Sequence, residues 1–473
     1  MFLHIDDNPN DWVVPMQRRQ LLKFGLSGFA SLGLSGLLRL RAQAAARKQK
    51  RTAIILVWLR GGCSHLDTWD PKPEASSDYR SPYTPIQTNV PGTIVTELLP
   101  RISQIADRFN LLRSVAHSGG GHPAGSLQVL AGDPASQDKT KPVLPDWMSI
   151  ANFLRSDTSR TLPNYVTVNP VDRYDSFTIA GATYLGPSFD PFRVTGDPSQ
   201  PDFEVPNIGL ANDKLAARLS SRVSLREKLD GLRRDIDATG ELRAVDDFDK
   251  AAVNLLTSPE ARVAFDLSQE ADTVRDRYGR NQWGQQCLMA RRLVEAGVEI
   301  ITTEFDGPLC GRVANWDDHA VNHHVFQAIK HRAPFFDQAV SALVEDIYAR
   351  GLDKRVMVVV TGEFGRTPRI SHVASSGGGV ASGAKGTVQP GRDHWPRANT
   401  MLFAGGGMQT GQVIGKTDPH GEDPVERRVG PGDFLATIYH HLGIDADHVA
   451  IPNFSGRPIP ILTRGKPIPE LLG

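Results

Sequence analysis

Acidic and histidine side chains recur in this sequence next to apolar runs, at places where a buried strand would end. They lie in three segments: Ser64-His65-Leu66-Asp67, Asp317-Asp318-His319, and Glu363 together with Asp393-His394. Carboxylates and imidazoles bind borderline and hard divalent cations, and the chain has no Cys-x-x-Cys pair that would offer thiolates instead. One zinc needs only about four ligands, so this surplus also matches two ions roughly 4 Å apart. The pattern predicts one or two divalent metal ions, with zinc, calcium and manganese as candidates.

A salt-bridge interpretation stays open for each pair taken alone. Glu363 and Asp393 would then simply neutralise Arg366, Arg369 or Arg392. Arg366 is also a candidate catalytic residue, because a guanidinium can hold two oxygens of a phosphate or sulfate group at once.

A glycine-rich segment, residues 117–126, reads H-S-G-G-G-H-P-A-G-S. Three consecutive glycines allow the backbone to approach a ligand closely. A helix is predicted to begin at Ser126, and the free N–H groups at its start would favour an anion. His122 and Ser126 are therefore candidate catalytic residues. The alternative is a glycine-rich linker that carries surface histidines.

Residues 317–331 hold four of the chain's 14 histidines. His319 and His323 are four residues apart, so on a helix they would share a face. Asp317 or Asp318 could instead cap a helix, which would explain one aspartate but not the cluster.

The elements that must position these side chains are predicted from the pattern of apolar residues. Strands are predicted at Ala53–Leu59, Asn110–Val115, Tyr165–Val168, Val298–Thr303, Val356–Val360 and Thr400–Ala404. Helices are predicted at Leu98–Asp107, Asp146–Leu154, Gly284–Glu295, His331–Arg350 and Pro431–Leu442. Residues 211–283 are predicted to form a helical insertion or cap, because most of this segment is amphipathic. In an open α/β sheet, ligands bind at the carboxyl ends of the strands, where the candidate residues occur.

The bulk composition excludes some classes of partner. Lys+Arg and Asp+Glu both number 53, so the chain carries no net charge that would attract nucleic acid or an anionic membrane. With only 3 cysteines, a disulfide framework is not expected.

The N-terminus has the pattern of an export signal. Arg18 and Arg19 form a twin-arginine motif, an apolar run follows at Phe24–Leu38, and residues 42–46 offer small-x-small cleavage sites. Residues 1–46 are therefore predicted to be a twin-arginine signal and residues 47–473 the mature domain. The expected partner is the export machinery, with only transient membrane contact and a periplasmic or extracellular destination. An uncleaved anchor is the alternative, although the apolar run is short for spanning a bilayer.

Several blocks of the mature chain resemble a known family. They are L-R-G-G-C-S-H-L-D-T-W-D-P-K-P, G-H-P-A-G, W-D-D-H, G-E-F-G-R-T-P, G-R-D-H-W-P and G-G-G-M-Q-T-G-Q-V-I-G. They resemble the domain of unknown function 1501 family, exported proteins grouped with the alkaline phosphatase and sulfatase superfamily. The resemblance implies a doubly wound, mostly parallel α/β sheet flanked by helices, with metal sites at the strand ends.

The resemblance also implies roles for individual residues. Asp67, with Ser64 as a rival, matches the aspartate expected after the first strand, and Ser126 lies near the nucleophile position, beside His122. The matches to the remaining metal positions are Asp317, His319, Glu363 and His394.

The chain also departs from the superfamily pattern. Glu363 stands where aspartate is usual, and Phe364 stands where a metal-binding histidine is usual. A second metal would then need His65, His122 or Asp393 as a substitute. None of the cysteines lies in a Cys-x-Pro-x-Arg motif, so a formylglycine sulfatase is not expected.

Two functions follow from the sequence. The first is an exported metal-dependent hydrolase of phosphate or sulfate esters, acting on an anionic ester substrate that belongs to a carbohydrate or another polymer. Ser126 or a metal-activated water would attack, and Arg366 would hold the anion. The alternative is a catalytically silent exported binding or structural module on the same fold, which the Phe364 departure favours.

Overall fold

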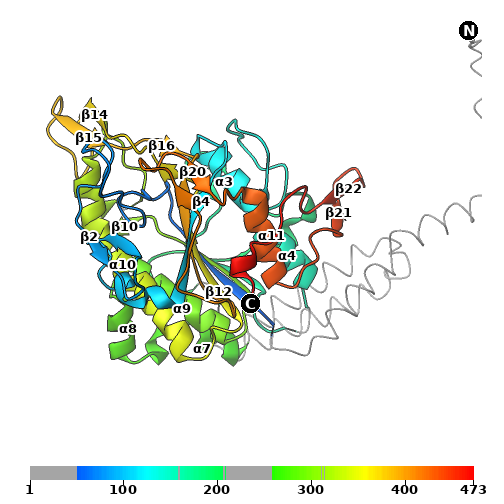
Figure 1. Ribbon diagram of the computed structural model, residues 1–473. Coiled ribbons are helices and arrows are strands. Elements are labelled where there is room, and N and C mark those ends of the chain that lie inside the picture. Colours follow the sequence, from blue (N-terminus) through cyan, green and yellow to red (C-terminus); the bar gives the residue numbers. More distant parts are fainter. Residues whose placement is uncertain (1–50, 158–159, 206–207, 209–257, 310–311, 314) are drawn as a thin grey trace, which may run out of the picture. The chain divides into compact units, whose positions relative to one another are not determined.

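An eight-stranded sheet runs through the centre of the protein (Figure 1). The computed structural model describes residues 51–157, 160–205, 208, 258–309, 312–313 and 315–473. In spatial order the strands are β18 (Val413–Ile414), β4 (Phe109–Val115), β17 (Asn399–Gly405), β12 (Val356–Thr361), β1 (Ala53–Trp58), β9 (Ile300–Glu304), β5 (Tyr165–Val168) and β8 (Phe192–Val194). Within this sheet β17 runs antiparallel to both neighbours, and the other pairings are parallel. The prediction of a mostly parallel sheet is confirmed.

Strand β1 lies at the middle of the sheet because every one of its side chains is apolar and buried. Its register places Ile55 beside Val358 of β12 and Ile301 of β9. Successive strand residues point to opposite faces, so Ile55 and Val57 enter one core while Ile54 and Leu56 enter the other. A strand of this kind requires cover on both faces.

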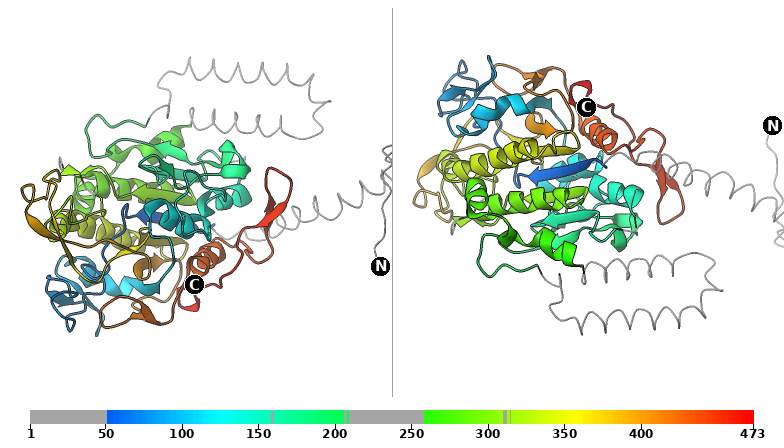
Figure 2. Two further views of the ribbon diagram at one scale, coloured as in Figure 1. Left: turned by 90° about the horizontal axis from the view of Figure 1, so that it is seen from above. Right: turned by 90° about the horizontal axis from the view of Figure 1, so that it is seen from below.

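Helices supply that cover on each side of the sheet (Figures 1 and 2). One face carries α7 (Pro259–Phe265), α8 (Asp272–Tyr278), α9 (Gln282–Glu295) and α10 (Val325–Ala349). The other face carries α3 (His122–Ala131), α4 (Trp147–Arg155) and α11 (Pro431–His441). The sheet is therefore doubly wound, as predicted.

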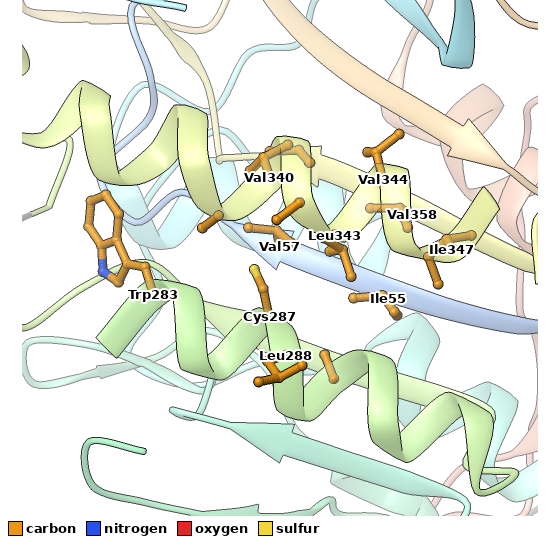
Figure 3. Packing of buried hydrophobic residues seen from close by; sticks show 14 of the residues in the cluster. Ile55, Val57, Trp283, Cys287, Leu288, Val340, Leu343, Val344, Ile347 and Val358 are labelled. Carbon is orange, nitrogen blue, oxygen red and sulfur yellow. The ribbon is translucent and has the colours of Figure 1, made fainter. Parts of the chain in front are cut away.

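The packing of α9 and α10 is shown in Figure 3. Cys287 of α9 points toward β1, where Ile55 and Val57 lie, and toward Leu343 of α10, whereas Leu288 points to the other side of α9; all five side chains are buried. This contiguous apolar layer fixes α10, and α10 in turn leads directly into β12.

Short elements form the loops around the sheet. The two-stranded pairs are β2 (Pro85–Gln87) with β3 (Ile94–Thr96), β6 (Arg173–Tyr174) with β7 (Phe177–Thr178), β10 (Pro308–Leu309) with β11 (Arg312–Val313), β13 (Gly365–Arg366) with β16 (His394–Trp395), β14 (Ser371–Ala374) with β15 (Val388–Gly391), β19 (Lys416–Thr417) with β20 (Pro424–Glu426), and β21 (Ala450–Pro452) with β22 (Pro458–Pro460). The 3₁₀ turns are η1 (Ile102–Arg108), η2 (Thr183–Leu185), η3 (Pro187–Phe189), η5 (Leu267–Gln269) and η6 (Pro469–Leu471).

Three helix predictions differ from the structure, and the first, Leu98–Asp107, is the shorter 3₁₀ helix η1, Ile102–Arg108. Helix α3 begins at His122 rather than at Ser126, with Gly121 as its N-cap and Pro123 within its first turn, where proline is tolerated. Helix α10 begins at Val325 rather than at His331 and includes Pro334. Both helices therefore begin earlier than predicted.

Residues 317–319 precede α10 and are not helical, so the expected shared helix face of His319 and His323 is wrong. His323 instead faces Asp318, which also forms a buried ion pair with Arg332. Asp318 thereby anchors the loop to α10 rather than joining His319.

Two predicted segments fall partly or wholly outside the described residues. Of the predicted insertion, 211–283, only 258–283 are described; α7 and α8 are helical there and pack against α9 and α10 in the core. The predicted signal, 1–46, lies outside them. Among the described residues, no helix has the length and apolar character that crossing a bilayer requires.

Candidate metal centre

Four side chains converge at the edge of the sheet where its parallel strands end. They are His122, Asp317, His319 and His394, and their potential ligand atoms all lie within 4.8 Å of one another. His122 comes from the first turn of α3, Asp317 and His319 from the loop before α10, and His394 from β16. His122 is buried, whereas the other three are partly exposed.

Asp317 lies at the middle of this cluster. Its Oδ1 is 2.8 Å from His319 Nε2 and 3.2 Å from His394 Nε2. Its Oδ2 is 3.2 Å from His122 Nε2 and accepts a hydrogen bond from the Tyr174 hydroxyl at 3.0 Å. Burial alone would raise the pKa of Asp317, but hydrogen bonds from the three imidazoles outweigh it and hold this pKa well below its usual range. Asp317 is therefore an anion at any physiological pH.

The three histidines share one arrangement, in which Nδ1 faces an acceptor outside the cluster. The acceptor is Glu363 Oε1 for His122 at 2.6 Å, Asp393 Oδ1 for His319 at 2.7 Å, and the Gly120 carbonyl for His394 at 2.9 Å. An oxygen acceptor fixes the proton on Nδ1, so each ring presents Nε2 to Asp317. Outer carboxylates and carbonyls in this position orient metal-binding histidines and raise their basicity.

Two of the rings differ in their protonation. Hydrogen bonds to Asp317 and Asp393 raise the pKa of His319 to about 9, whereas burial lowers the pKa of His394. The Nε2 atoms of these two rings are 3.2 Å apart. A bound cation would take the place of the Nε2 proton, so metal binding here would release protons.

These residues fit a divalent metal. Three Nε2 atoms and one carboxylate give the set of four that zinc binds in proteins. Imidazole nitrogens suit zinc and other transition metals, whereas calcium prefers an all-oxygen set of six to eight ligands. Among the metals predicted from the sequence, the donor chemistry favours zinc or manganese over calcium.

Glu363 follows β12 and lies behind His122. It is fully buried, and its Oε1 accepts hydrogen bonds from His122 Nδ1 and, at 3.0 Å, from the Gly61 amide. Its Oε2 has no hydrogen-bonding partner among the described residues. Glu363 therefore contacts the cluster through His122, and Asp393 contacts it through His319.

Phe364 fills the space next to these residues. It is fully buried, with its ring centroid 5.2 Å from that of His122 and 4.5 Å from that of His394. A side chain added at Gly62, whose φ is +80°, would come within 2.6 Å of the Phe364 ring. The position that the family resemblance reserves for a metal-binding histidine is therefore packed with an aromatic ring.

Arg366 contacts the cluster through Asp317. Its guanidinium donates to the carbonyls of Gly61, Gly62 and Arg392 and to Asp317 Oδ1, the last at 2.8 Å. Its side chain is only 2% exposed. These contacts position Asp317 and the β1 loop, and they occupy the donors that the predicted anion-holding role requires.

Three of the residues predicted for the site do not join the cluster. Asp67 forms a fully buried ion pair with Arg392 at 2.9 Å, and His65 Nε2 faces the Gly421 carbonyl at 2.9 Å. Ser126 lies one helical turn beyond His122, is fully buried, and its Oγ has no partner among the described residues. Its role as nucleophile stays a prediction.

The expected anion site at the start of α3 is occupied by a side chain of the protein itself. The Asp138 carboxylate accepts the backbone N–H of Ala124 at 3.0 Å. A carboxylate there already uses the favourable end of the helix dipole.

Sequence reasoning missed one contributor, Tyr174, and placed His122 mainly among the catalytic residues. His122 was proposed as a catalytic residue or a substitute ligand, but its place in the cluster depends on the earlier start of α3. Tyr174 was not singled out, although it stacks on His122 with a centroid distance of 3.8 Å and donates to Asp317. The signal for His122 was available, because proline one residue after it is typical of a helix's first turn.

Residues 51–472 match the family described as Protein of unknown function (DUF1501), and the chain belongs to this family. No curated protein matches the chain significantly. Similar solved structures include a protein in the alkaline phosphatase superfamily from Vibrio parahaemolyticus, with 10% identity over 86% of this chain and 74% of that one, at a TM-score of 0.37. The PsFucS1 sulfatase from Pseudoalteromonas sp. has 12% identity over 87% of this chain and 71% of its own, at a TM-score of 0.33. The C-terminal periplasmic domain of EcEptC from Escherichia coli, in complex with Zn, has 11% identity over 85% and 84%, at a TM-score of 0.33.

Proposed function

We propose that this protein is an exported, metal-dependent hydrolase of phosphate or sulfate esters. The observation that carries the proposal is the convergence of three imidazole Nε2 atoms on Asp317, each ring oriented by an acceptor at Nδ1. Structural ion pairs do not require three histidines with the same orientation. A metal site does, because each ligand must present a lone pair to one point.

His122, Asp317, His319 and His394 would hold the ion in this proposal. A divalent ion at this point would polarise an ester oxygen and lower the pKa of a water nucleophile. Glu363 and Asp393 would orient His122 and His319 rather than bind the ion themselves.

The surrounding residues would position the centre rather than react. Arg366 holds Asp317 in place, and Tyr174 donates to the other oxygen of the same carboxylate. Because Ser126 is closed off from solvent, we favour water over Ser126 as the attacking group. Phe364 packs where a second ion would be expected, which favours a single ion per chain.

The second candidate is a catalytically silent binding module on the same fold. The burial of both Phe364 and Ser126 favours it, because an aromatic ring stands in place of a ligand and the hydroxyl is inaccessible. A protein of this kind could retain the histidine cluster and even bind metal, but it would not hydrolyse esters.

The test begins with metal content and activity of the purified exported protein. We expect about one divalent ion per chain and hydrolysis of at least one class among aryl phosphates, aryl phosphodiesters and aryl sulfates. His394→Ala should remove metal and activity together, while His448→Ala, at an exposed histidine paired with Asp445, should remove neither. Protein that stays inert after loading with zinc or manganese would refute the hydrolase and leave the binding module.

Ser126→Ala separates the two proposed nucleophiles. Water attack predicts that activity survives this substitution, because the buried hydroxyl has no partner to lose among the described residues. An inactive variant that remains folded and metal-loaded would restore Ser126 as the nucleophile.

Export is proposed from the sequence alone. The twin-arginine motif at Arg18 and Arg19 would direct the folded, metal-loaded protein across the membrane. Replacement of both arginines by lysine should retain the full-length protein in the cytoplasm, which fractionation measures.

A further inference from the structure

We propose that a cleft beside the metal centre binds a carbohydrate, so that the esters hydrolysed are those of sugars. The inference deepens the hydrolase proposal and rests on it for the reaction, but not for the binding. The cleft has a volume of about 490 Å³ and lies between residues 367–372 and the segment Asp393–Trp395. This volume is in the range of small-molecule sites.

The cleft and the centre share structural elements. Asp393 lines the cleft and also accepts from His319 Nδ1, and Trp395 directly follows His394 in β16. The opposite wall begins with Thr367, immediately after Arg366 of β13. A substrate whose ester group lies at the histidines would therefore extend past Asp393 into the cleft.

The cleft is lined by both basic and acidic residues, which favours a polyhydroxylated ligand over a polyanionic one. Arg369 is exposed and forms no ion pair with any described residue, and His372 is exposed beside it. Two acidic residues, Asp393 and Glu422, belong to the same lining. A densely charged polyanion would be repelled by these carboxylates, whereas sugar hydroxyls both donate and accept and would pair with both kinds of group.

Trp395 gives the cleft a fixed aromatic surface. Its Nε1 donates to the Glu422 carbonyl at 2.7 Å, and the Arg397 guanidinium lies 5.2 Å from its ring centroid. The ring is partly exposed and lines the cleft. A ring held in this way offers apolar contact area at little entropic cost, and the C–H faces of a pyranose match such a surface.

Hydrolysis provides the first arm of the test. We expect Trp395→Ala and Arg369→Ala to lower the ratio of kcat/KM for glucose 6-phosphate or N-acetylglucosamine 6-sulfate to that for the matching aryl ester, each about five- to tenfold. Trp395→Phe should recover part of the ratio. Arg428→Ala, at an exposed arginine outside the cleft lining, should not change it. Metal content is measured for every variant, because Trp395 adjoins His394.

Direct binding provides the second arm and remains informative if no ester is hydrolysed. Calorimetry with neutral oligosaccharides and with inorganic polyphosphate should show binding of the saccharides, weakened about five- to tenfold by Trp395→Ala. Binding of polyphosphate alone, or saccharide binding that Trp395→Ala leaves intact, would overturn the inference. Saccharide binding without hydrolysis would support the cleft and count against the hydrolase.

Discussion

The contact between Glu363 and His122 offers the sharpest test of how this centre is built. Glu363→Gln keeps an oxygen that can accept from His122 Nδ1 and from the Gly61 amide, but it removes the negative charge. Loss of an outer partner of this kind weakens metal affinity by about 10- to 100-fold, or roughly 1.4–2.7 kcal/mol. The variant should therefore still bind metal, but with a clearly higher Kd.

The same substitution should also lower the stability of the metal-free protein. The new amide group would lie where Glu363 Oε2 is, and that atom is buried and has no hydrogen-bonding partner among the described residues. A buried donor without a partner costs about 1–3 kcal/mol. The two effects can be separated, because one is read from zinc affinity and the other from unfolding without metal.

The assay is competition for zinc against a chromophoric chelator, combined with urea unfolding of the metal-free protein. Asp337→Asn is the matched control, because Asp337 is a buried carboxylate that accepts the backbone N–H groups of Arg101 and Ile102. It should lower stability without changing the zinc Kd. If Glu363→Gln loses as much zinc affinity as His394→Ala, then Glu363 binds the metal directly. An unchanged affinity would mean that His122 is not a ligand.

Three further outcomes follow from buried groups around the centre. Burial lowers the pKa of His117 to about 4, and its Nδ1 accepts from the Gly119 amide, so the folded protein holds it neutral while the unfolded chain protonates near 6.5. The metal-free protein should therefore lose up to ~3 kcal/mol of stability as pH falls from 6.5 to 4, and His117→Gln should flatten this dependence in urea titrations. Arg392→Met leaves the Asp67 charge buried without its partner and should cost about 3–5 kcal/mol, without loss of metal; metal loss would instead make Asp67 a ligand. Gly62→Ala forces a Cβ against Phe364 at a positive φ and should lower the free energy of unfolding by about 1–3 kcal/mol, measured by thermal unfolding; a neutral effect would contradict the tight packing at this turn.

Much of the fold could be predicted because its signals are local. The runs at Val356–Val360 and Ala53–Leu59 are apolar on every residue, which specifies strands covered on both faces, and the structure places them side by side as β12 and β1. The ends of such strands also predict where ligands gather, so Asp317, His319 and His394 were found before their contacts were known.

Helix starts were predicted less well, and the start of α3 decides which of its side chains lies at the site. Pro123 follows His122 within the first turn of α3, so the helix begins at the histidine and not at Ser126. A shift of four residues exchanges which side chain stands at the helix start and which lies one turn deeper. The sequence therefore identified the segment and both side chains, but it did not show that His122 is the one that joins the cluster.

The sequence by itself determined the sheet and the types of side chain delivered to its edge, because apolar periodicity and strand ends are properties of short segments. Only the tertiary structure decided which of those side chains meet. Glu363 and His122 are 241 positions apart in the chain. Whether the glutamate contacts a metal or a histidine depends on the distance between these side chains in the folded protein, which no local sequence pattern specifies. The partners of Arg366 and Arg392 were likewise decided by packing: each guanidinium is buried, and a buried charge must take whichever acceptors the surrounding loops bring within reach.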